Sequence, residues 1–144
     1  MIVGFFGHSS VLQAEEVCDR LSLLLEDTIK DRDVEFFLGM HGAFDALSYK
    51  AACRFKKTHG DARLILVPPY LDARVQERSP KYDAILYPPI ESVPKRFAIL
   101  ARNRYVAEKA DVLFAYVCHR YGGAAQALAV AERKQKPIFN LALL

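Results

Sequence analysis

Short apolar runs alternate along this chain with longer stretches in which apolar residues recur every three or four positions. Continuous apolar runs are typical of strands buried on both faces, and the wider spacing is typical of helices. The runs predict strands at 2–6, 34–38, 63–67, 84–87, 112–117 and 138–142. The wider spacing predicts helices from Ser10 to about Ile29, at 44–58, at 95–110, and from Gly122 to about Lys134.

Strands that alternate with helices predict an α/β fold. We expect a Rossmann-like, doubly wound, mostly parallel sheet of about six strands with helices on both faces. Right-handed crossovers favour the strand order 3-2-1-4-5-6, in which the fourth strand lies beside the first. The sequence shows no internal repeat and no linker, so residues 1–144 are expected to form a single domain.

Two segments between the strands carry further signals. Ser10 begins a Ser-x-x-Gln capping box, which predicts that the first helix starts there. Residues 68–83 are polar and predict a long loop with at most one helical turn. Loops of this length are usually functional or mobile. We therefore expect this one to act as a lid, with Arg74 and Arg78 as closing cations.

The composition suits an ordinary globular protein, because 52% of the residues are hydrophobic and 26% are charged. The net charge of +3 tolerates phosphate-bearing ligands but does not by itself indicate a nucleic-acid-binding protein. No apolar run approaches the roughly 20 residues that span a bilayer. The N-terminus also lacks the basic segment of a signal peptide. We therefore expect a cytoplasmic protein that does not bind membranes.

The three cysteines are far apart and odd in number, which predicts small buried thiols in a reducing compartment. They are Cys18, Cys53 and Cys118. Cys118 is not expected to pair with His119, because adjacent residues of a strand point to opposite faces.

Three histidines directly follow predicted strands: His8, His41 and His119. The carboxyl ends of parallel strands share one edge of the sheet, and open α/β folds bind their ligands at that edge. The sequence therefore predicts that the three imidazoles gather along one rim.

The turn after the first strand contains small residues and hydroxyls that would let an anion approach a helix N-terminus. Gly7, His8, Ser9 and Ser10 are therefore candidate phosphate-binding residues. In the alternative interpretation, Ser10 only caps the helix and His8 only bonds a neighbouring loop.

The turn after the second strand places two glycines around a histidine and an acid in the first turn of the next helix. Gly39, His41 and Gly42 allow close backbone approach, and Asp45 could bind a ribose hydroxyl or accept a proton. Asp45 could equally serve only to stabilise the helix N-terminus.

The turn after the fifth strand brings Gly122 and Gly123 to the start of a helix, where their amides could reach a phosphate. Arg102 and Asn103 lie beside the apolar face of the preceding helix, which consists of Ile99, Val106 and Ala110. Arginine suits a phosphate or carboxylate, provided that this helix begins beside the carboxyl edge. A plain turn and a solvated helix face are the alternatives.

No metal is expected, because no pair of histidines has the spacing of ligands on one helix. No cofactor is required for the fold, although a bound nucleotide would fit these turns.

Four segments together resemble the SLOG superfamily, and most closely its small YpsA-like branch of unknown function. They are Gly-Phe-Phe-Gly-His at 4–8, Gly-Met-His-Gly-Ala-Phe-Asp at 39–45, Val-Pro-Lys-Arg-Phe-Ala-Ile-Leu-Ala-Arg-Asn-Arg at 93–104, and Tyr-Gly-Gly-Ala at 121–124. The resemblance covers nearly the whole chain. It implies a Rossmann-like sheet that binds nucleotides or nucleotide-derived ligands.

The LOG phosphoribohydrolases and the DNA-processing protein DprA are more distant members of this superfamily. Arg102 matches the arginine of the LOG Arg-Lys pair, and Asn103 stands in place of the lysine. Gly122 and Gly123 approximate the LOG glycine loop. The glutamates that follow that loop are replaced by Ala124, Ala125 and Gln126, and Glu132 is about two turns too far. The resemblance therefore implies binding more strongly than hydrolysis.

We expect a binding domain for a nucleotide or an ADP-ribose-like ligand. One alternative is an N-glycosidic or phosphoribosyl hydrolase, with Asp45 as base and His41 or His119 as acid. The other is a single-strand nucleic-acid binder, since DprA binds single strands and one helix region here is basic. Its basic residues are Lys95, Arg96, Arg102, Arg104 and Lys109. A homodimer is expected if the alanine-rich last helix exposes an apolar patch.

Overall fold

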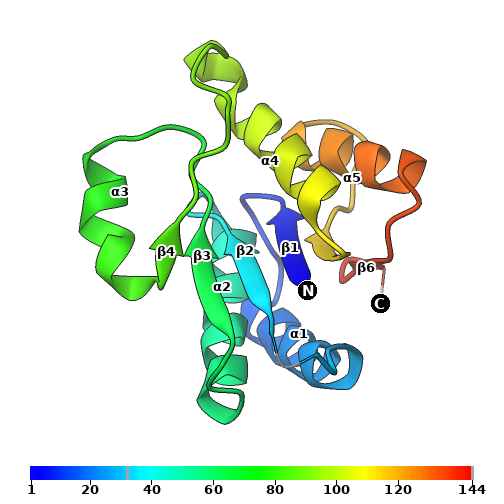
Figure 1. The fold of residues 1–144 in the computed structure, drawn as a ribbon. Helices are drawn as coiled ribbons and strands as arrows, with labels where there is room; N and C mark the ends of the chain where they lie inside the picture. The colour runs from blue at the N-terminus through cyan, green and yellow to red at the C-terminus, as the bar shows by residue number, and fades with distance from the viewer. Residues whose placement is uncertain (32, 144) are drawn as a thin grey trace.

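The computed structural model describes residues 1–31 and 33–143, which form a six-stranded parallel sheet between two layers of helices (Figure 1). The strands are β1 (Ile2–Gly7), β2 (Glu35–Leu38), β3 (Arg63–Leu66), β4 (Ala84–Ile85), β5 (Val112–Tyr116) and β6 (Ile138–Asn140). The helices are α1 (Ala14–Thr28), α2 (Ala43–Thr58), α3 (Ala73–Arg78), α4 (Ala98–Lys109) and α5 (Gly123–Arg133), with short 3-10 turns at Ser79–Lys81 and Lys95–Phe97. The predicted Rossmann-like α/β fold is confirmed.

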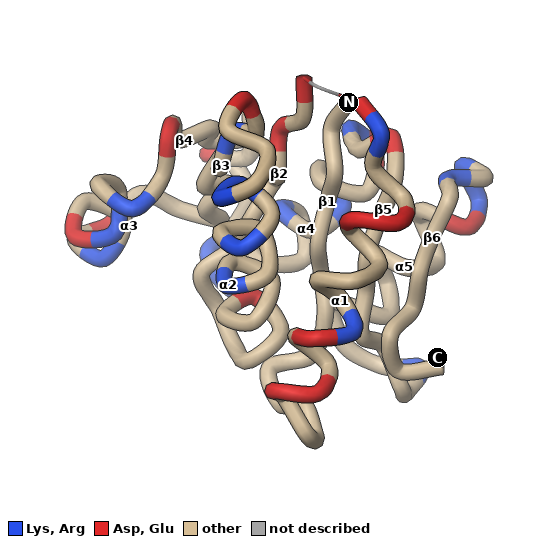
Figure 2. The backbone as a smooth tube through the Cα atoms, turned by 90° about the horizontal axis from the view of Figure 1, so that it is seen from below, with Lys and Arg blue, Asp and Glu red and all other residues tan. Residues whose placement is uncertain are grey.

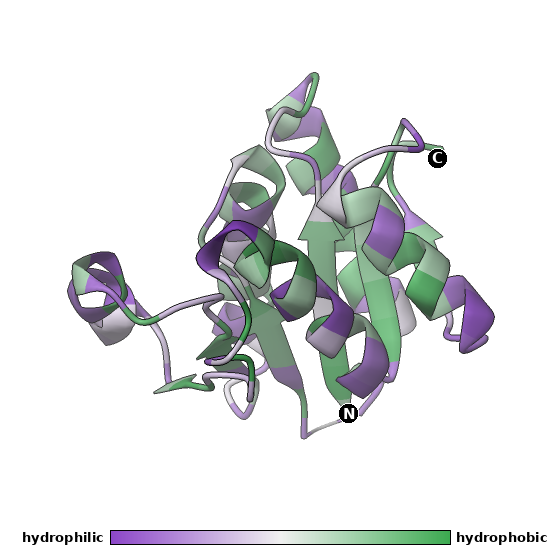
Figure 3. Cartoon of the chain, turned by 90° about the horizontal axis from the view of Figure 1, so that it is seen from above, coloured by the Kyte–Doolittle hydropathy of each residue, from purple (hydrophilic) through white to green (hydrophobic). Residues whose placement is uncertain are grey.

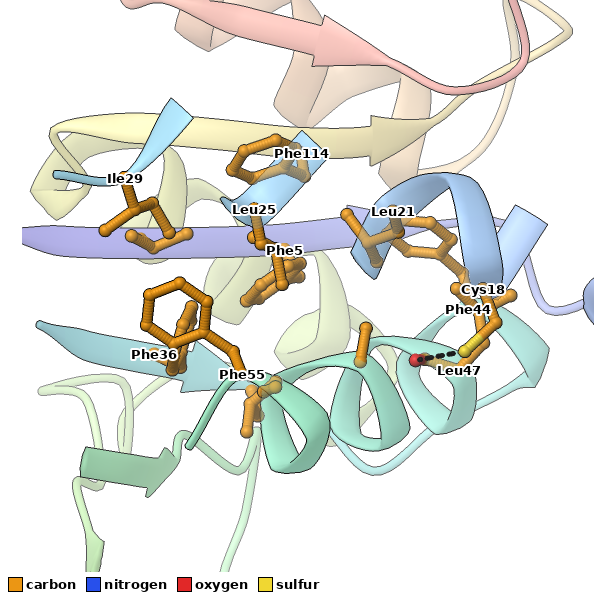
Figure 4. Close-up of a cluster of buried hydrophobic side chains, with 14 of the residues drawn as sticks. Phe5, Cys18, Leu21, Leu25, Ile29, Phe36, Phe44, Leu47, Phe55 and Phe114 are labelled. Atoms are coloured by element: carbon orange, nitrogen blue, oxygen red, sulfur yellow. Dashed lines mark hydrogen bonds between the residues drawn. The ribbon is translucent and has the colours of Figure 1, made fainter. Parts of the chain in front are cut away.

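The two faces of the sheet have separate cores because successive strand residues point to opposite sides. Phe5 and Phe36 pack beneath α1 and α2, where Leu21 and Phe55 meet them (Figure 4). The neighbouring Phe6 and Phe37 face α4 and α5 and pack with residues that include Val106 and Ala127. Figure 3, which looks onto the α4 and α5 side, shows hydrophobic strands behind helices that mix hydrophilic and hydrophobic residues.

The strand order is β4-β3-β2-β1-β5-β6, so the predicted order was wrong in the position of the fourth strand. The short β4 lies outside β3, and β1 pairs directly with β5. The chain before β4 stays beside β3 because the Asp83 N–H donates to the Leu64 carbonyl at 2.8 Å. The connections reverse direction between β1 and β5, which is the point where doubly wound sheets open a crevice.

The first helix begins at Ala14, so the capping box predicted at Ser10 was wrong. Gln13 precedes α1 in a left-handed conformation with φ 54° and makes no side-chain cap. The Ser9 carbonyl instead accepts the Ala43 N–H at 2.9 Å, which ties the loop after β1 to the start of α2. Because of this contact the chain crosses the carboxyl edge of the sheet before it turns into a helix.

The segment 68–83 contains more structure than the sequence predicts. Asp72 accepts the N–H groups of Arg74 and Val75 and so caps α3, which a 3-10 turn follows. Figures 1 and 2 show α3 beside β4 and apart from both helix layers, and it carries basic and acidic positions together.

The cysteines differ from the prediction at one position. Cys18 is buried, and its thiol donates to the Leu47 carbonyl at 3.6 Å (Figure 4). Cys53 is half-buried, but Cys118 is exposed. Cys118 follows the end of β5 by two residues, so strand alternation no longer decides its environment.

The last helix does not expose the apolar patch that would favour a homodimer. Ala124, Ala127, Val130 and Ala131 of α5 are buried. None of the exposed large hydrophobic side chains in the described ranges belongs to this helix. The condition for expecting a homodimer is therefore not met by this helix. Within 1–31 and 33–143, no helix is both long and apolar enough to cross a membrane.

Candidate functional site

The three strand-end histidines line one crevice of about 400 Å³ at the carboxyl edge of the sheet. We call this space the crevice. The loop after β1 contributes Gly7, His8 and Ser9, the loop after β2 contributes His41 and Gly42, and the loop after β5 contributes His119, Gly122 and Gly123. Asn103 reaches it from α4. The crevice lies beside the junction of β1 and β5, where the order of the connections reverses.

A smaller cavity of about 30 Å³ adjoins the crevice and shares Gly7, His41 and Asn103 with it. Its lining includes the remaining predicted residues Gly39, Asp45 and Arg102. We call it the inner cavity. Of the predicted set, only Ser10 lines neither space, since it is exposed on the loop before α1.

Arg102 crosses the carboxyl edge beneath these cavities. Its Nε donates to the Val67 carbonyl at 2.8 Å, and its Nη1 donates to the Phe5 carbonyl at 3.3 Å and to Asn103 Oδ1 at 3.0 Å. The residue is only 3% exposed, and Nη2 has no hydrogen-bond partner among the described residues. Burial lowers the pKa of Arg102, and the nearby Asp45 opposes that shift. The buried guanidinium therefore retains one donor group without a partner beside the inner cavity.

Asp45 lies in the first turn of α2 and is 9% exposed. Its Oδ2 accepts the His41 N–H at 2.9 Å, so the carboxylate holds the loop after β2. Burial raises the pKa of Asp45, while Arg102 and the His41 hydrogen bond act in the opposite direction. No hydrogen bond joins Asp45 to Arg102 in the described structure, so the two charges interact only through space. Asp45 does not cap α2, since that helix has no side-chain cap, and its roles in ligand binding and at the helix N-terminus stay predictions.

His41 lies between the crevice and the segment 68–83. The Tyr70 hydroxyl is 3.3 Å from His41 Nε2, and Arg74 Nη2 is 3.5 Å from the same hydroxyl. Burial lowers the pKa of His41, and Arg74 and Arg102 lower it further. The neutral imidazole is therefore favoured in a positively charged environment.

Two helices begin beside the crevice with the same glycine conformation. Gly42 precedes α2 with φ 91° and ψ 177°, and Gly122 precedes α5 with φ 91° and ψ 175°. Only glycine adopts this region readily. Neither helix has a side-chain cap. The Ala43 N–H at the start of α2 donates to the Ser9 carbonyl, whereas a side chain at Gly122 would meet open space. The partial positive charge of both helix N-termini thus faces one space, from opposite sides of the sheet.

His8 and His119 are stacked, with their ring centroids 3.7 Å apart and their planes at 10°. His8 Nε2 accepts the Cys118 N–H at 3.0 Å, and His119 Nδ1 donates to the Tyr121 carbonyl at 3.0 Å. Burial lowers the pKa of His8, and the adjacent His119 lowers it further. The stack is therefore favoured with His8 neutral.

His8, Cys118 and His119 also place potential metal ligands within 4.8 Å of one another. An imidazole binds a metal ion in the plane of its ring, and these two planes are nearly parallel. One ring would have to turn before both could bind one ion. The expectation that the site uses no metal stays a prediction.

Sequence reasoning missed Tyr70 and misplaced Ile99. Tyr70 follows Pro68 and Pro69 directly after a predicted strand. This place at the carboxyl edge of the sheet could have marked it as a candidate site residue. Ile99 is 42% exposed and lines the crevice, because α4 overhangs the sheet at this end.

The five basic residues of the 95–109 region do not share one face of the helix, since Arg102 is buried and Arg104 is exposed.

No protein-family model matches the chain, and no curated protein matches its sequence. The fold is similar to that of DNA processing protein A from Helicobacter pylori, which is described with a single-stranded DNA binding mode, and to that of DprA from Streptococcus pneumoniae. Each is 16% identical, and the TM-scores are 0.66 and 0.67. The similarity covers 97% and 96% of this chain but only 64% and 49% of the two neighbours. It establishes the fold, while membership of the SLOG superfamily and of its YpsA-like branch stays a prediction.

Proposed function

We propose that the crevice binds the phosphate end of a nucleotide or of a nucleotide derivative such as ADP-ribose. The observation that carries this proposal is the unpartnered Nη2 of Arg102, which is buried beside the inner cavity. A buried donor without a partner costs roughly 1–3 kcal/mol, so a ligand that accepts from it gains specifically at this place.

The two glycine-led helices support the same ligand class. Anions bind at helix N-termini because the first amides lack partners and the helix dipole adds positive charge. Gly122 is open to solvent on its Cβ side and leaves the start of α5 accessible. Gly42 lies across the crevice from it, so a phosphate between them would meet positive potential from both layers.

The size of the crevice is compatible with a ligand of this class. Small-molecule sites usually occupy about 300–1,000 Å³ and combine apolar walls with a few converging polar groups. Here the volume is about 400 Å³, and Ile99 supplies an apolar part of the lining. His41 and Asp45 lie where a ribose hydroxyl would approach the loop after β2.

A thermal-shift series with AMP, ADP-ribose, NAD and inorganic phosphate tests the proposal. A ligand present at 100 times its dissociation constant stabilises the native state by about 2.7 kcal/mol, which raises the melting temperature by several degrees. Arg102→Lys keeps the positive charge but loses the planar guanidinium with its several N–H donors. This variant should abolish or strongly reduce the shift in melting temperature. Arg104→Lys is the matched control, because Arg104 is exposed on the same helix. No shift with any phosphate compound at millimolar concentration would refute the proposal.

The second candidate is a nucleotide unit within a single strand, and the likeness to DprA favours it. Arg78 and Lys81 line a cavity that shares Gly39, Gly42 and Asp45 with the two spaces described above. A strand leaving the crevice toward β4 would therefore meet exposed cations. Affinity that rises with oligonucleotide length and falls with salt, by about 0.7 log units per phosphate and per decade of salt, supports this candidate. Affinity that is equal for AMP and for a ten-nucleotide strand rejects it.

A further inference from the structure

We propose that the exposed face of Tyr121 is a stacking platform for the base of the bound nucleotide. This inference rests on the proposed function and specifies where the base of the ligand lies relative to its phosphate.

Three rings form a continuous stack at the mouth of the crevice. His119 lies 3.7 Å from His8 and 3.8 Å from Tyr121, with interplanar angles of 10° and 13°. Two rings this close and this parallel to the same imidazole must lie on opposite faces of it. His119 is therefore enclosed between its neighbours, and Tyr121 is the outermost ring.

The stack is fixed in place by groups that do not depend on a ligand. The Cys118 N–H binds His8, and the Tyr121 carbonyl binds His119. The edge of the His8 ring meets Tyr116 at 6.3 Å and 87°, and Tyr116 in turn stacks on the buried Phe44. The orientation of the outer ring is thus set through a chain of aromatic contacts that begins in the core beneath α2.

The outer ring is open to solvent and adjoins the proposed phosphate site. Tyr121 is 72% exposed, whereas Phe97, the other exposed Phe or Tyr in the described ranges, is 47% exposed. It lines the crevice together with Gly122 and Gly123, the glycines next to it in sequence. A phosphate on the amides of α5 therefore places the attached nucleoside within reach of the tyrosine ring.

The occupant favoured here is a flat heteroaromatic base. Bases stack on aromatic side chains with little regard to sequence, because every base has a π face. The platform offers the base the face of an aromatic ring. We therefore expect adenine and guanine nucleotides to bind alike, and pyrimidine nucleotides to bind more weakly because their rings overlap the tyrosine less.

Calorimetry with AMP, GMP, CMP and ribose 5-phosphate on the full chain tests this inference. Wild type should bind AMP on the order of tenfold to a hundredfold more tightly than ribose 5-phosphate, which is the usual contribution of one stacked base. Tyr121→Phe keeps the ring and should retain this preference. Tyr121→Leu removes the ring and should bring AMP down to the level of ribose 5-phosphate. Both variants are at an exposed position, and unchanged melting temperatures without ligand would verify their folding.

The outcomes separate the two proposals. Equal affinity of wild type for AMP and ribose 5-phosphate, with no effect of Tyr121→Leu, overturns the platform and leaves the phosphate site intact. A clear preference of wild type for AMP that Tyr121→Leu does not change also overturns it, since the base then binds elsewhere. Failure of every phosphate compound to bind overturns the proposed function, and the platform with it.

Discussion

The guanidinium of Arg102 on α4 donates its Nε–H to the Val67 carbonyl, just beyond the end of β3, at 2.8 Å. The same group reaches the Phe5 carbonyl of β1 through Nη1, so it spans the strand that lies between β3 and β1. One side chain thus joins α4 to two separated strands, lines the inner cavity and still has an unpartnered Nη2. If the proposed function holds, the same residue serves both the structure and ligand recognition.

Arg102→Lys is expected to destabilise the native state by about 1–3 kcal/mol. A single ammonium cannot bind both carbonyls in their present positions, so one buried acceptor loses its partner. Chemical unfolding of the variant measures the loss. Arg104→Lys should change stability by no more than about 0.5 kcal/mol, as is usual for an exposed position. Equal effects of the two substitutions would contradict the bridging role.

Gly42→Ala is expected to be more damaging than Gly122→Ala. Both positions have φ 91°, and a side chain there costs roughly 1–3 kcal/mol of backbone strain. At Gly42 a Cβ would also lie 2.6 Å from the Ser9 Cα, whereas at Gly122 it would meet open space. Comparing the two variants by thermal unfolding isolates the steric contribution, since the strain is common to both. A Gly122 variant less stable than its Gly42 counterpart would contradict the geometry.

Stability should decrease below pH 6.5 in part because of His41. The unfolded chain binds a proton on this imidazole near pH 6.5, whereas burial and the nearby arginines hold the native pKa lower. The native state therefore binds fewer protons between these two values, and the free energy of unfolding falls as the pH falls through that window. His41→Gln should lose less stability than wild type between pH 7 and pH 5. His8 acts in the same direction, so the variant keeps part of the dependence.

Asp45→Asn is expected to become more stable than wild type as the pH rises above 3.8. Burial raises the native pKa of Asp45 above that ordinary value, so the native state binds more protons in the window between them. The contribution of Asp45 to stability is then greatest below pH 3.8 and is lost as the pH rises through its native pKa. The asparagine can still accept the His41 N–H but does not ionise. Urea unfolding of both proteins at several pH values measures the difference, which should not shrink toward neutral pH.

Wild type is expected not to release free base from AMP. Asp45 is held by the loop after β2, and the positions after the glycine turn are Ala124, Ala125 and Gln126 rather than acids. Chromatography of AMP after prolonged incubation with the protein detects adenine. Release by wild type and not by Asp45→Asn would instead support the hydrolase alternative.

The strand ends and the crevice were predictable because they depend on local patterns. Apolar runs followed by glycine and histidine mark the ends of β1, β2 and β5, and parallel topology then brings His8, His41 and His119 to one edge. The helix face of Phe44, Leu47, Ala51 and Phe55 is buried as the spacing predicts.

The errors arise where tertiary contacts override local signals. Ser10 has the pattern of a cap, but the Ser9 carbonyl is already bound to α2, and the helix begins later. The position of β4 depends on which edge a two-residue strand reaches, and its sequence carries no such information. Contacts such as that of Tyr70 with His41 join segments 29 residues apart and leave no periodic trace in the chain.

The unpartnered Nη2 of Arg102 also has a consequence for selecting more thermostable variants of this protein. A screen for heat resistance without ligand would favour substitutions that remove an unsatisfied polar group from the interior. If the proposed function holds, the variants that gain thermal stability most easily would be those that bind the proposed ligand most weakly. Directed evolution of this fold should therefore be carried out with the ligand in the medium.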